Sequence, residues 1–198
     1  MGSGKNGTFD KRPDWNQWAI FCCHRTEDIS FFSEDHFSKI HGKFIFNWCQ
    51  LFCKENYSIV LTPVMGHGFW DGKEVFGKLK SSVEFGGPIA TLTRATIRLS
   101  KLQFFWKNVA PVAQKMSTAP GFLFSLGIGE IPWIKQATFS IWDSIDSMKA
   151  FAYGMKEHAE VIKKTKQQKW YSEDLFVRFK IEKIVGKINP NNPLKRIP

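Results

Sequence analysis

The chain has 198 residues, 43% of them hydrophobic, and a formal net charge of +10. This length fits one ordinary domain or two small, closely packed halves, with ample material for a core. The charge favours an acidic protein or an anionic membrane surface as partner, and no nucleic-acid partner is expected, because helix-turn-helix, zinc-finger and RNP motifs are absent from the sequence.

The cysteines and the hydropathy pattern exclude several other classes. Cys22, Cys23, Cys49 and Cys53 lack the spacing of a disulfide framework, and Cys49 and Cys53 with His24 fit no common zinc pattern. The sequence has no apolar run of 18 residues and no signal peptide. We therefore expect a reduced, cytoplasmic protein whose membrane contact, if any, is peripheral, at the inner face of the membrane.

The front of the chain, residues 1–64, predicts an incomplete ferredoxin-like repeat. Residues 16–23 (NQWAIFCC) alternate as a strand, a Phe-rich helix ends in the tryptophan segment NWCQLF, and residues 58–64 form an apolar strand. Residues 65–89 follow as a glycine- and aromatic-rich connector. A loop of that size usually carries function or covers a pocket.

Residues 90–186 predict a complete repeat. The expected elements are a strand at 90–98, a helix capped by Ser100, strands at 121–130 and 135–144, a helix opened by Ser144 that carries His158, and a strand at 173–185. This β-α-β-β-α-β order is the ferredoxin-like pattern, an α+β fold, and residues 187–198 are left as a flexible tail. The likeness of NQWAIFCC to KQATFSIW predicts two such repeats that pack sheet against sheet.

His158 follows Phe151 and Tyr153 on an amphipathic helix. A neutral imidazole among apolar and aromatic side chains suits an axial ligand of haem iron. A buried histidine hydrogen-bonded to the backbone would leave the same pattern, and this segment alone favours that interpretation. The eight Trp and 19 Phe suit a pocket for a large flat or polyenic ligand, although a Phe-rich core is the commoner explanation.

Arg94 and Arg98 lie four residues apart on one face of the predicted strand. They could point into a barrel and bind haem propionates or polarise bound oxygen. They could equally lie on a solvated face, which the sequence alone favours. Carboxylates are scattered and no nucleophilic triad is apparent, so neither paired acid–base chemistry nor a triad is indicated.

Several longer motifs occur in a fixed order: GHGFWDGKEVFG (66–77), LTRATIR (92–98), FFWKNVAPV (104–112), GFLFSLGIGEIP (121–132), QATFSIWDSIDSMKAFAYGMKEHAEVI (136–162) and WYSEDLFVRF (170–179). Together they resemble the spheroidene monooxygenase family, which are haem-containing carotenoid oxygenases of bacteria. The resemblance covers most of the chain from about residue 15 and is densest over residues 90–179.

This resemblance implies a fold of the dimeric α+β-barrel type with haem in one ferredoxin-like half. The proximal histidine of related barrels lies on the second helix of such a half, which corresponds to His158 here. His36 or His41 occupies the pseudo-equivalent place in the front helix and is the fallback, and His67 is a weaker candidate. The expected catalytic residues are His158, Arg94 and Arg98, and the expected haem contacts are His158, Phe151, Tyr153, Met155, Ile162 and Arg94.

The implied reaction inserts a keto oxygen into an acyclic carotenoid or a similar long apolar substrate, with electrons from an acidic donor such as a ferredoxin. A homo-oligomer and contact with an anionic membrane holding the substrate are further expectations. Two alternatives stay open: a haem-binding barrel with dehydratase or peroxidase-like activity, and a non-catalytic ligand-binding module. Family members begin with a further strand and helix, so we expect an N-terminally shortened member.

Overall fold

The computed structural model describes residues 14–23, 38–39, 41–79, 86–131, 133–154, 163–165 and 167–197. The chain divides into two compact units, Met1–Phe21 with Pro63–Phe179, and Cys22–Thr62 with Lys180–Pro198. This division follows contacts in space, whereas the domains expected from sequence follow repeats along the chain. The expected domain boundaries therefore stay a prediction.

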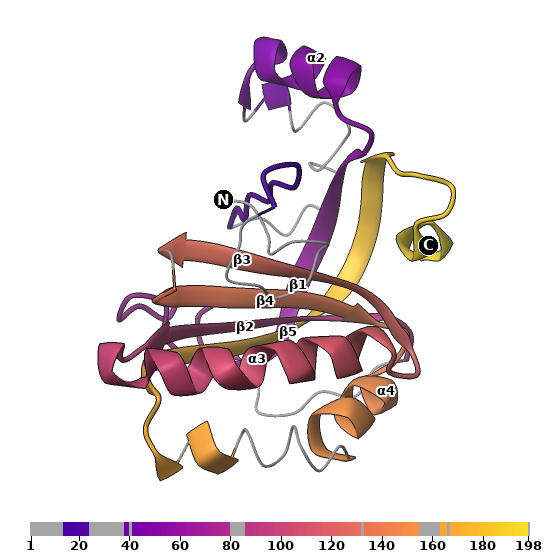
Figure 1. Ribbon diagram of the computed structural model, residues 1–198. Helices are drawn as coiled ribbons and strands as arrows, with labels where there is room; N and C mark the ends of the chain where they lie inside the picture. Colours follow the sequence, from indigo (N-terminus) through magenta and orange to yellow (C-terminus); the bar gives the residue numbers. More distant parts are fainter. Residues whose placement is uncertain are drawn as a thin grey trace. The chain divides into compact units, whose positions relative to one another are not determined.

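Five strands form one sheet in the order β1-β5-β2-β4-β3 (Figure 1). The strands are β1 (Asn56–Gly68), β2 (Ile89–Ile97), β3 (Phe122–Ile131), β4 (Lys135–Trp142) and β5 (Tyr171–Lys187). Strand β4 pairs antiparallel with both β2 and β3. Helix α3 (Leu102–Ser117) joins β2 to β3, and α4 (Ile145–Lys149) follows β4. The order from β2 to β5 is β-α-β-β-α-β, which confirms the ferredoxin-like expectation.

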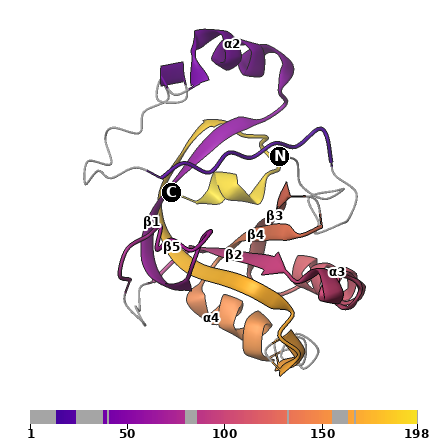
Figure 2. The same cartoon turned by 90° about the vertical axis from the view of Figure 1, so that its left-hand side faces the viewer.

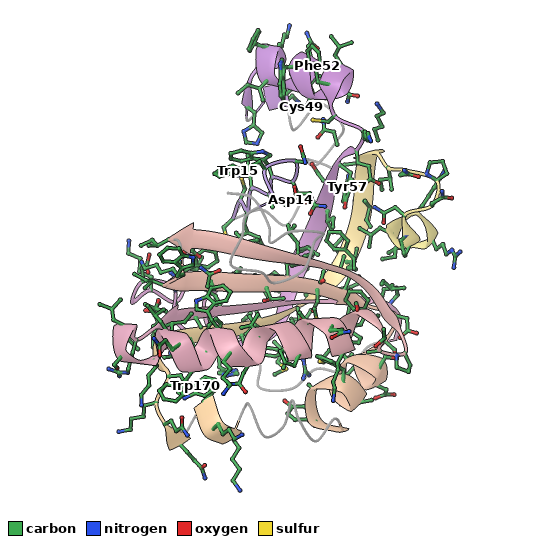
Figure 3. All side chains as sticks on the ribbon, in the orientation of Figure 1. Asp14, Trp15, Cys49, Phe52, Tyr57 and Trp170 are labelled. Atoms are coloured by element: carbon green, nitrogen blue, oxygen red, sulfur yellow. The ribbon has the colours of Figure 1, made fainter. Side chains whose placement is uncertain are left out.

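Helices α3 and α4 lie on the same face of this sheet (Figures 1 and 2). Side chains of a strand alternate between the two faces, so Ile89 and Ile97 of β2 point toward the helices and Arg94 points away. One core cluster gathers around Ile89 and Trp142 with residues of α3 and α4. A second joins Ile97 to Trp170, labelled in Figure 3, and to aromatic residues of α3.

Of the two serines predicted to cap helices, Ser144 does so and Ser100 does not. The Ser144 hydroxyl accepts a hydrogen bond from the backbone N–H of Ser147 at 3.1 Å, which confirms Ser144 as the cap of α4. The predicted Ser100 cap is wrong. Ser100 lies inside the 3₁₀ turn η3 (Leu99–Lys101), and α3 then begins behind Lys101 without a side-chain cap. The chain leaves β2 through this tight turn, which places Ser100 too early to cap the helix.

The strand expected at residues 16–23 is also wrong. Trp15 and Asn16 form a turn, in which the Asn16 N–H donates to Asp14 Oδ1 at 2.9 Å, and no described residue from 17 to 23 is in a strand. A short polar side chain that binds the backbone two residues on competes with strand pairing. Strand β1 is longer than expected, and the tryptophan segment ends α2 (Lys43–Phe52), as the sequence predicts.

The C-terminal residues expected as a flexible tail contact the chain ahead of β1. Glu55 Oε1 accepts hydrogen bonds from the Asn189 N–H at 2.8 Å and from Asn192 Nδ2 at 3.0 Å. Asn192 caps the 3₁₀ turn η5 (Pro193–Arg196), and Leu194 in that turn is fully buried. Glu55 therefore holds the C-terminal residues 189–192 through two hydrogen bonds.

Candidate functional site

Arg94 is fully buried on the face of the sheet that lies away from α3 and α4, with an exposed fraction of 0%. Its Nε and Nη2 donate to the two oxygens of Glu130 at 2.8 and 2.9 Å. Its Nη1 donates to Glu173 Oε1 at 2.7 Å, and Nη2 donates also to Asp71 Oδ1 at 2.8 Å. Every nitrogen of this guanidinium is therefore engaged by a carboxylate.

The connector after β1 supplies the cover over Arg94. It begins at Gly68, where φ is 95° and a Cβ would strike the backbone carbonyl of Asp174, so only glycine fits. The chain then places the Trp70 ring 5.0 Å from the Arg94 guanidinium carbon. The connector thus closes over the most deeply buried charge of the sheet, and the expectation that it carries function or covers a pocket stays a prediction.

Backbone and side chain of the connector bind the same carboxylate network. The N–H groups of Asp71 and Gly72 donate to the two oxygens of Glu173 at 2.8 and 2.7 Å. Lys135 of β4 donates to Asp71 Oδ1 at 2.6 Å. We call this set the Arg94 cluster: Arg94, Trp70, Asp71, Glu130, Lys135 and Glu173. It joins β2, β3, β4, β5 and the connector through charged hydrogen bonds.

The Arg94 cluster favours the charged forms of Asp71, Glu173 and Arg94. Hydrogen bonds from Lys135 and then from Arg94 lower the pKa of Asp71. Burial would raise the pKa of Glu173, but the backbone N–H groups it accepts, together with Arg94, outweigh burial and lower that pKa. Burial would likewise lower the pKa of Arg94, and its hydrogen bonds to Glu130 and Asp71 outweigh it and raise the pKa. All these groups are ionised at neutral pH.

The lowered pKa of Glu173 predicts a stability that falls in acid. A carboxyl whose pKa is lower in the folded than in the unfolded chain stabilises the fold above the unfolded value, about 4.3 for Glu, and this contribution is lost as the pH falls through the folded value. We expect Glu173→Gln to cost about 1–2 kcal/mol of unfolding free energy at pH 6, because a hydrogen-bonded charge is lost from a partly exposed site. Urea unfolding followed by tryptophan fluorescence from pH 6 downward measures it.

The difference in unfolding free energy between the wild-type protein and Glu173→Gln should narrow steadily below about pH 4. Asp174→Asn, which removes the neighbouring exposed carboxyl, is the matched control and should follow the wild-type pH profile. A Glu173→Gln protein whose deficit stays constant from neutral to acid pH would contradict the assigned charge state.

Arg178 of β5 lies on the opposite, helix-bearing face. Its neighbour Phe179 packs against Phe76 of the connector, 5.5 Å between ring centroids, so alternation turns Arg178 away from the connector. Arg178 is 7% exposed, and its buried Nε has no hydrogen-bond partner among the described residues. Burial lowers the pKa of Arg178, while Tyr153 on the turn after α4 acts in the opposite direction. The Arg178 guanidinium lies 5.4 Å from the Phe176 ring centroid.

The residues expected around a haem are only partly within the described chain. His158, Met155 and Ile162, as well as His36, lie outside the described residues. The described helix continues past α4 as the π-turn η4 (Ala150–Gly154) and leads into that segment. Such π-turns occur frequently at functional sites.

Phe151 and Tyr153 of η4 differ in their burial. Phe151 is 7% exposed and packs against Trp142, with ring centroids 5.1 Å apart, whereas Tyr153 is 66% exposed. His67 lies on β1 with its ring 5.7 Å from that of Phe176, and His41 lies just ahead of α2. The haem-contact roles of these residues stay predictions.

The two expected arginines differ in their surroundings. Arg94 is buried, whereas Arg98 is exposed and donates from Nε to the Tyr171 carbonyl at 3.1 Å. Because β2 ends at Ile97, strand alternation no longer relates Arg98 to Arg94. Their catalytic roles stay predictions, and in this structure the hydrogen-bond donors of Arg94 already have carboxylate partners.

The sequence did not predict most of the Arg94 cluster, because its three carboxylates are scattered along the chain. Glu130 and Glu173 are brought together by sheet pairing, and Asp71 reaches them from the connector. Arg178 had a local signal, since its immediate neighbours in DLFVRFKI are the apolar Val177 and Phe179. Among the described residues, no group of three or more His, Cys, Asp and Glu side chains could hold a metal ion.

The fold and these sites define the class of the protein: a ferredoxin-like α+β domain with one buried arginine on each face of its sheet. Over 195 residues the chain is 30% identical to the spheroidene monooxygenase of Rhodobacter capsulatus, covering 98% of this chain and 78% of that protein. It is 34% identical over 195 residues to the spheroidene monooxygenase of Cereibacter sphaeroides, covering 98% of this chain and 58% of that protein. The chain belongs to the spheroidene monooxygenase family, and spans little more than half the length of the Cereibacter relative.

Comparison with solved structures gives weaker similarity. A monooxygenase structure from Fusobacterium nucleatum matches with a TM-score of 0.48 and 13% identity, over 77% of this chain and 65% of that one. The cofactor-independent oxygenase SnoaB of Streptomyces nogalater matches with a TM-score of 0.40 and 13% identity, over 48% of this chain and 94% of that one. Similarity at this level carries no functional argument. No model of a protein family matches the chain.

Proposed function

We propose that the protein is a haem-dependent monooxygenase that inserts a keto oxygen into an acyclic carotenoid or a similar long apolar molecule. The observation that carries the proposal is the 30% identity to the Rhodobacter capsulatus spheroidene monooxygenase, spread over 98% of this chain. Two hydroxylations of one methylene carbon followed by loss of water give the ketone. Each hydroxylation consumes one dioxygen, two electrons and two protons, and releases one water.

Haem would supply the activation of dioxygen, and the chain would supply binding and orientation. The described residues fit such a group at Arg178, whose buried Nε has no hydrogen-bond partner. Haem carries two propionates, and a guanidinium is the side chain best suited to bind a carboxylate. His158, which follows η4 in the sequence, would hold the haem iron.

The same proposal includes a peripheral membrane contact, an acidic electron donor and a homo-oligomer. Helix α2 leaves Phe44, Leu51 and Phe52 exposed by 81%, 75% and 64% (Phe52 is labelled in Figure 3). Exposed apolar side chains and a net charge of +10 together suit an anionic bilayer that holds an apolar substrate. Within the described ranges, none of the helices combines the length and the apolar character needed to cross a bilayer.

The test is turnover of an acyclic carotenoid by the purified, haem-loaded protein with oxygen and a reduced ferredoxin. We expect a ketocarotenoid that takes up label from ¹⁸O₂, and faster conversion when the carotenoid is supplied in anionic than in neutral vesicles. Mass spectrometry of the extracted pigment measures the product and the origin of its oxygen.

Two controls separate the alternatives. A reaction driven by hydrogen peroxide with no need for reductant would indicate peroxidase-like chemistry, and conversion without incorporation of label would indicate a dehydratase. Haem-free protein should leave the pigment unchanged. Haem binding without conversion under any of these conditions would overturn the enzymatic proposal and leave a ligand-binding module.

A further inference from the structure

Arg178 is a buried cation that the described chain leaves without a counter-ion. Its exposed fraction is 7%, and its Nε has no hydrogen-bond partner. The acidic side chains that form ion pairs within the described ranges pair with Arg94, Lys135 or Lys180, and none pairs with Arg178. The two buried arginines of the sheet therefore differ, because Arg94 has three carboxylates and Arg178 has none.

A buried charge without a counter-ion lowers the stability of the fold, so the burial of Arg178 calls for a compensating interaction. Removing an ion from water costs several kcal/mol unless a partner compensates. The Phe176 ring, 5.4 Å from the guanidinium carbon, offsets only part of this. An anion bound from outside the described chain would supply the missing compensation, and would gain affinity from the low local dielectric.

The surroundings of Arg178 indicate what kind of molecule would carry this anion. Phe176 lies beside the guanidinium, and the His67 ring lies 5.7 Å from Phe176 at 38°. The phenol of Tyr153 on η4 acts on the pKa of Arg178 against the effect of burial. These are flat, largely apolar surfaces around one cationic donor group. They fit an apolar ligand with a carboxylate at one end, because the rings contact the body of the ligand and the guanidinium takes its charge.

We propose that Arg178 binds the carboxylate of an apolar ligand seated between β5 and η4 on the helix-bearing face of the sheet. The inference deepens the proposed function and, in its haem form, rests on it: the carboxylate is then a haem propionate. A long-chain fatty carboxylate offers the same chemistry. In the sequence, the assigned haem ligand His158 comes four residues after the end of η4.

The test compares haemin with its dimethyl ester, which has the same ring and iron but no carboxylate. Each is titrated into the wild-type chain and into Arg178→Gln, and the dissociation constant is measured from the change in absorbance. We expect the wild-type protein to prefer haemin to the ester by about tenfold, the usual size of a charge-assisted hydrogen-bonded contact. The preference should vanish in Arg178→Gln. Arg196→Gln, which removes an exposed arginine of η5, should retain it.

A parallel titration with palmitate distinguishes the two carboxylate sources. Palmitate binding that depends on Arg178, in a protein that binds no haemin, would support this inference while the proposed function fails. Haemin and its ester binding equally well to all three proteins, with palmitate unaffected by Arg178→Gln, would overturn the inference and leave the proposed function standing.

A second variant keeps the inference testable if Arg178→Gln folds poorly. Arg178→Leu removes the unpaired buried charge, so the ligand-free protein should melt at a higher temperature than the wild type. Saturating haemin or palmitate should then raise the Tm of the wild-type protein more than that of Arg178→Leu. Equal Tm shifts in both proteins would count against the anion site.

Discussion

Replacing Arg94 by methionine is expected to lower the free energy of unfolding by about 3 kcal/mol, the low end of the cost of breaking a buried ion pair. The variant leaves Glu130 and Glu173 facing each other without their shared cation, and these side chains are only 24% and 20% exposed. Lys135 remains beside Asp71 and limits the loss. Urea unfolding at neutral pH, followed by tryptophan fluorescence, measures the change.

A rescue variant separates the charge from the packing of Arg94. Arg94→Met combined with Glu130→Gln and Glu173→Gln removes the repulsion along with the cation, so most of the lost stability should return. Arg98→Met is the matched control, because Arg98 is an exposed arginine at the end of the same strand, and its effect should stay within about 0.5 kcal/mol.

The same variants distinguish a structural from a ligand-binding Arg94. A propionate-binding Arg94 would weaken haemin binding in Arg94→Met while the unfolding curve stays close to that of the wild type. A loss of stability with little change in haemin affinity in the folded protein would instead assign Arg94 to the fold. We expect the second result, because each nitrogen of the guanidinium already donates to a carboxylate.

Replacing His158 by alanine is expected to abolish the Soret spectrum of a histidine-ligated haem and to weaken haemin binding well beyond tenfold. Loss of even the outer hydrogen-bond partners of metal-ligating histidines costs about 10–100-fold in metal affinity, so loss of the ligand itself should cost more. Absorbance titration of haemin into the purified variant measures both effects, and added imidazole should restore part of the spectrum by occupying the vacated position.

His41→Ala is the control, since His41 is a candidate within the described residues and is not among the rings placed beside Arg178. It should retain the wild-type Soret spectrum, His67→Ala tests the weaker candidate, and circular dichroism should show that all three variants keep the fold. An unchanged spectrum in His158→Ala, with loss in His41→Ala or His67→Ala, would transfer the axial role to that histidine.

The sequence predicted the elements of the second repeat well because their signals are local. The alternation in ATLTRATIR and KQATFSIW, and a serine followed by helical periodicity at Ser144, correspond to β2, β4 and α4. The expectation for residues 16–23 failed for a different reason. The apolar pattern there resembles a strand, but no neighbouring strand pairs with it among the described residues, and a polar turn at Asp14 directs the chain instead.

The candidate sites depended much more on pairing between distant strands. From sequence, Arg94 and Arg98 appear equivalent, and only the end of β2 at Ile97 separates a buried residue from an exposed one. The cover over Arg94 needed the turn at Gly68 and the backbone donors at Asp71 and Gly72, which no periodicity predicts.

The sequence by itself determined the order of elements, the ferredoxin-like class and the family, because hydrophobic periodicity, turn residues and shared motifs act along the chain. The tertiary structure decided which charges are paired. Sheet order β5-β2-β4-β3 brings Glu173, Arg94, Lys135 and Glu130 from four strands to one face, and the alternation of β5 places Arg178 on the other, where no described residue forms an ion pair with it. The pairing of Arg94 and the lack of a described partner for Arg178 affect stability because both are buried, and a charge removed from water is stable only beside a partner.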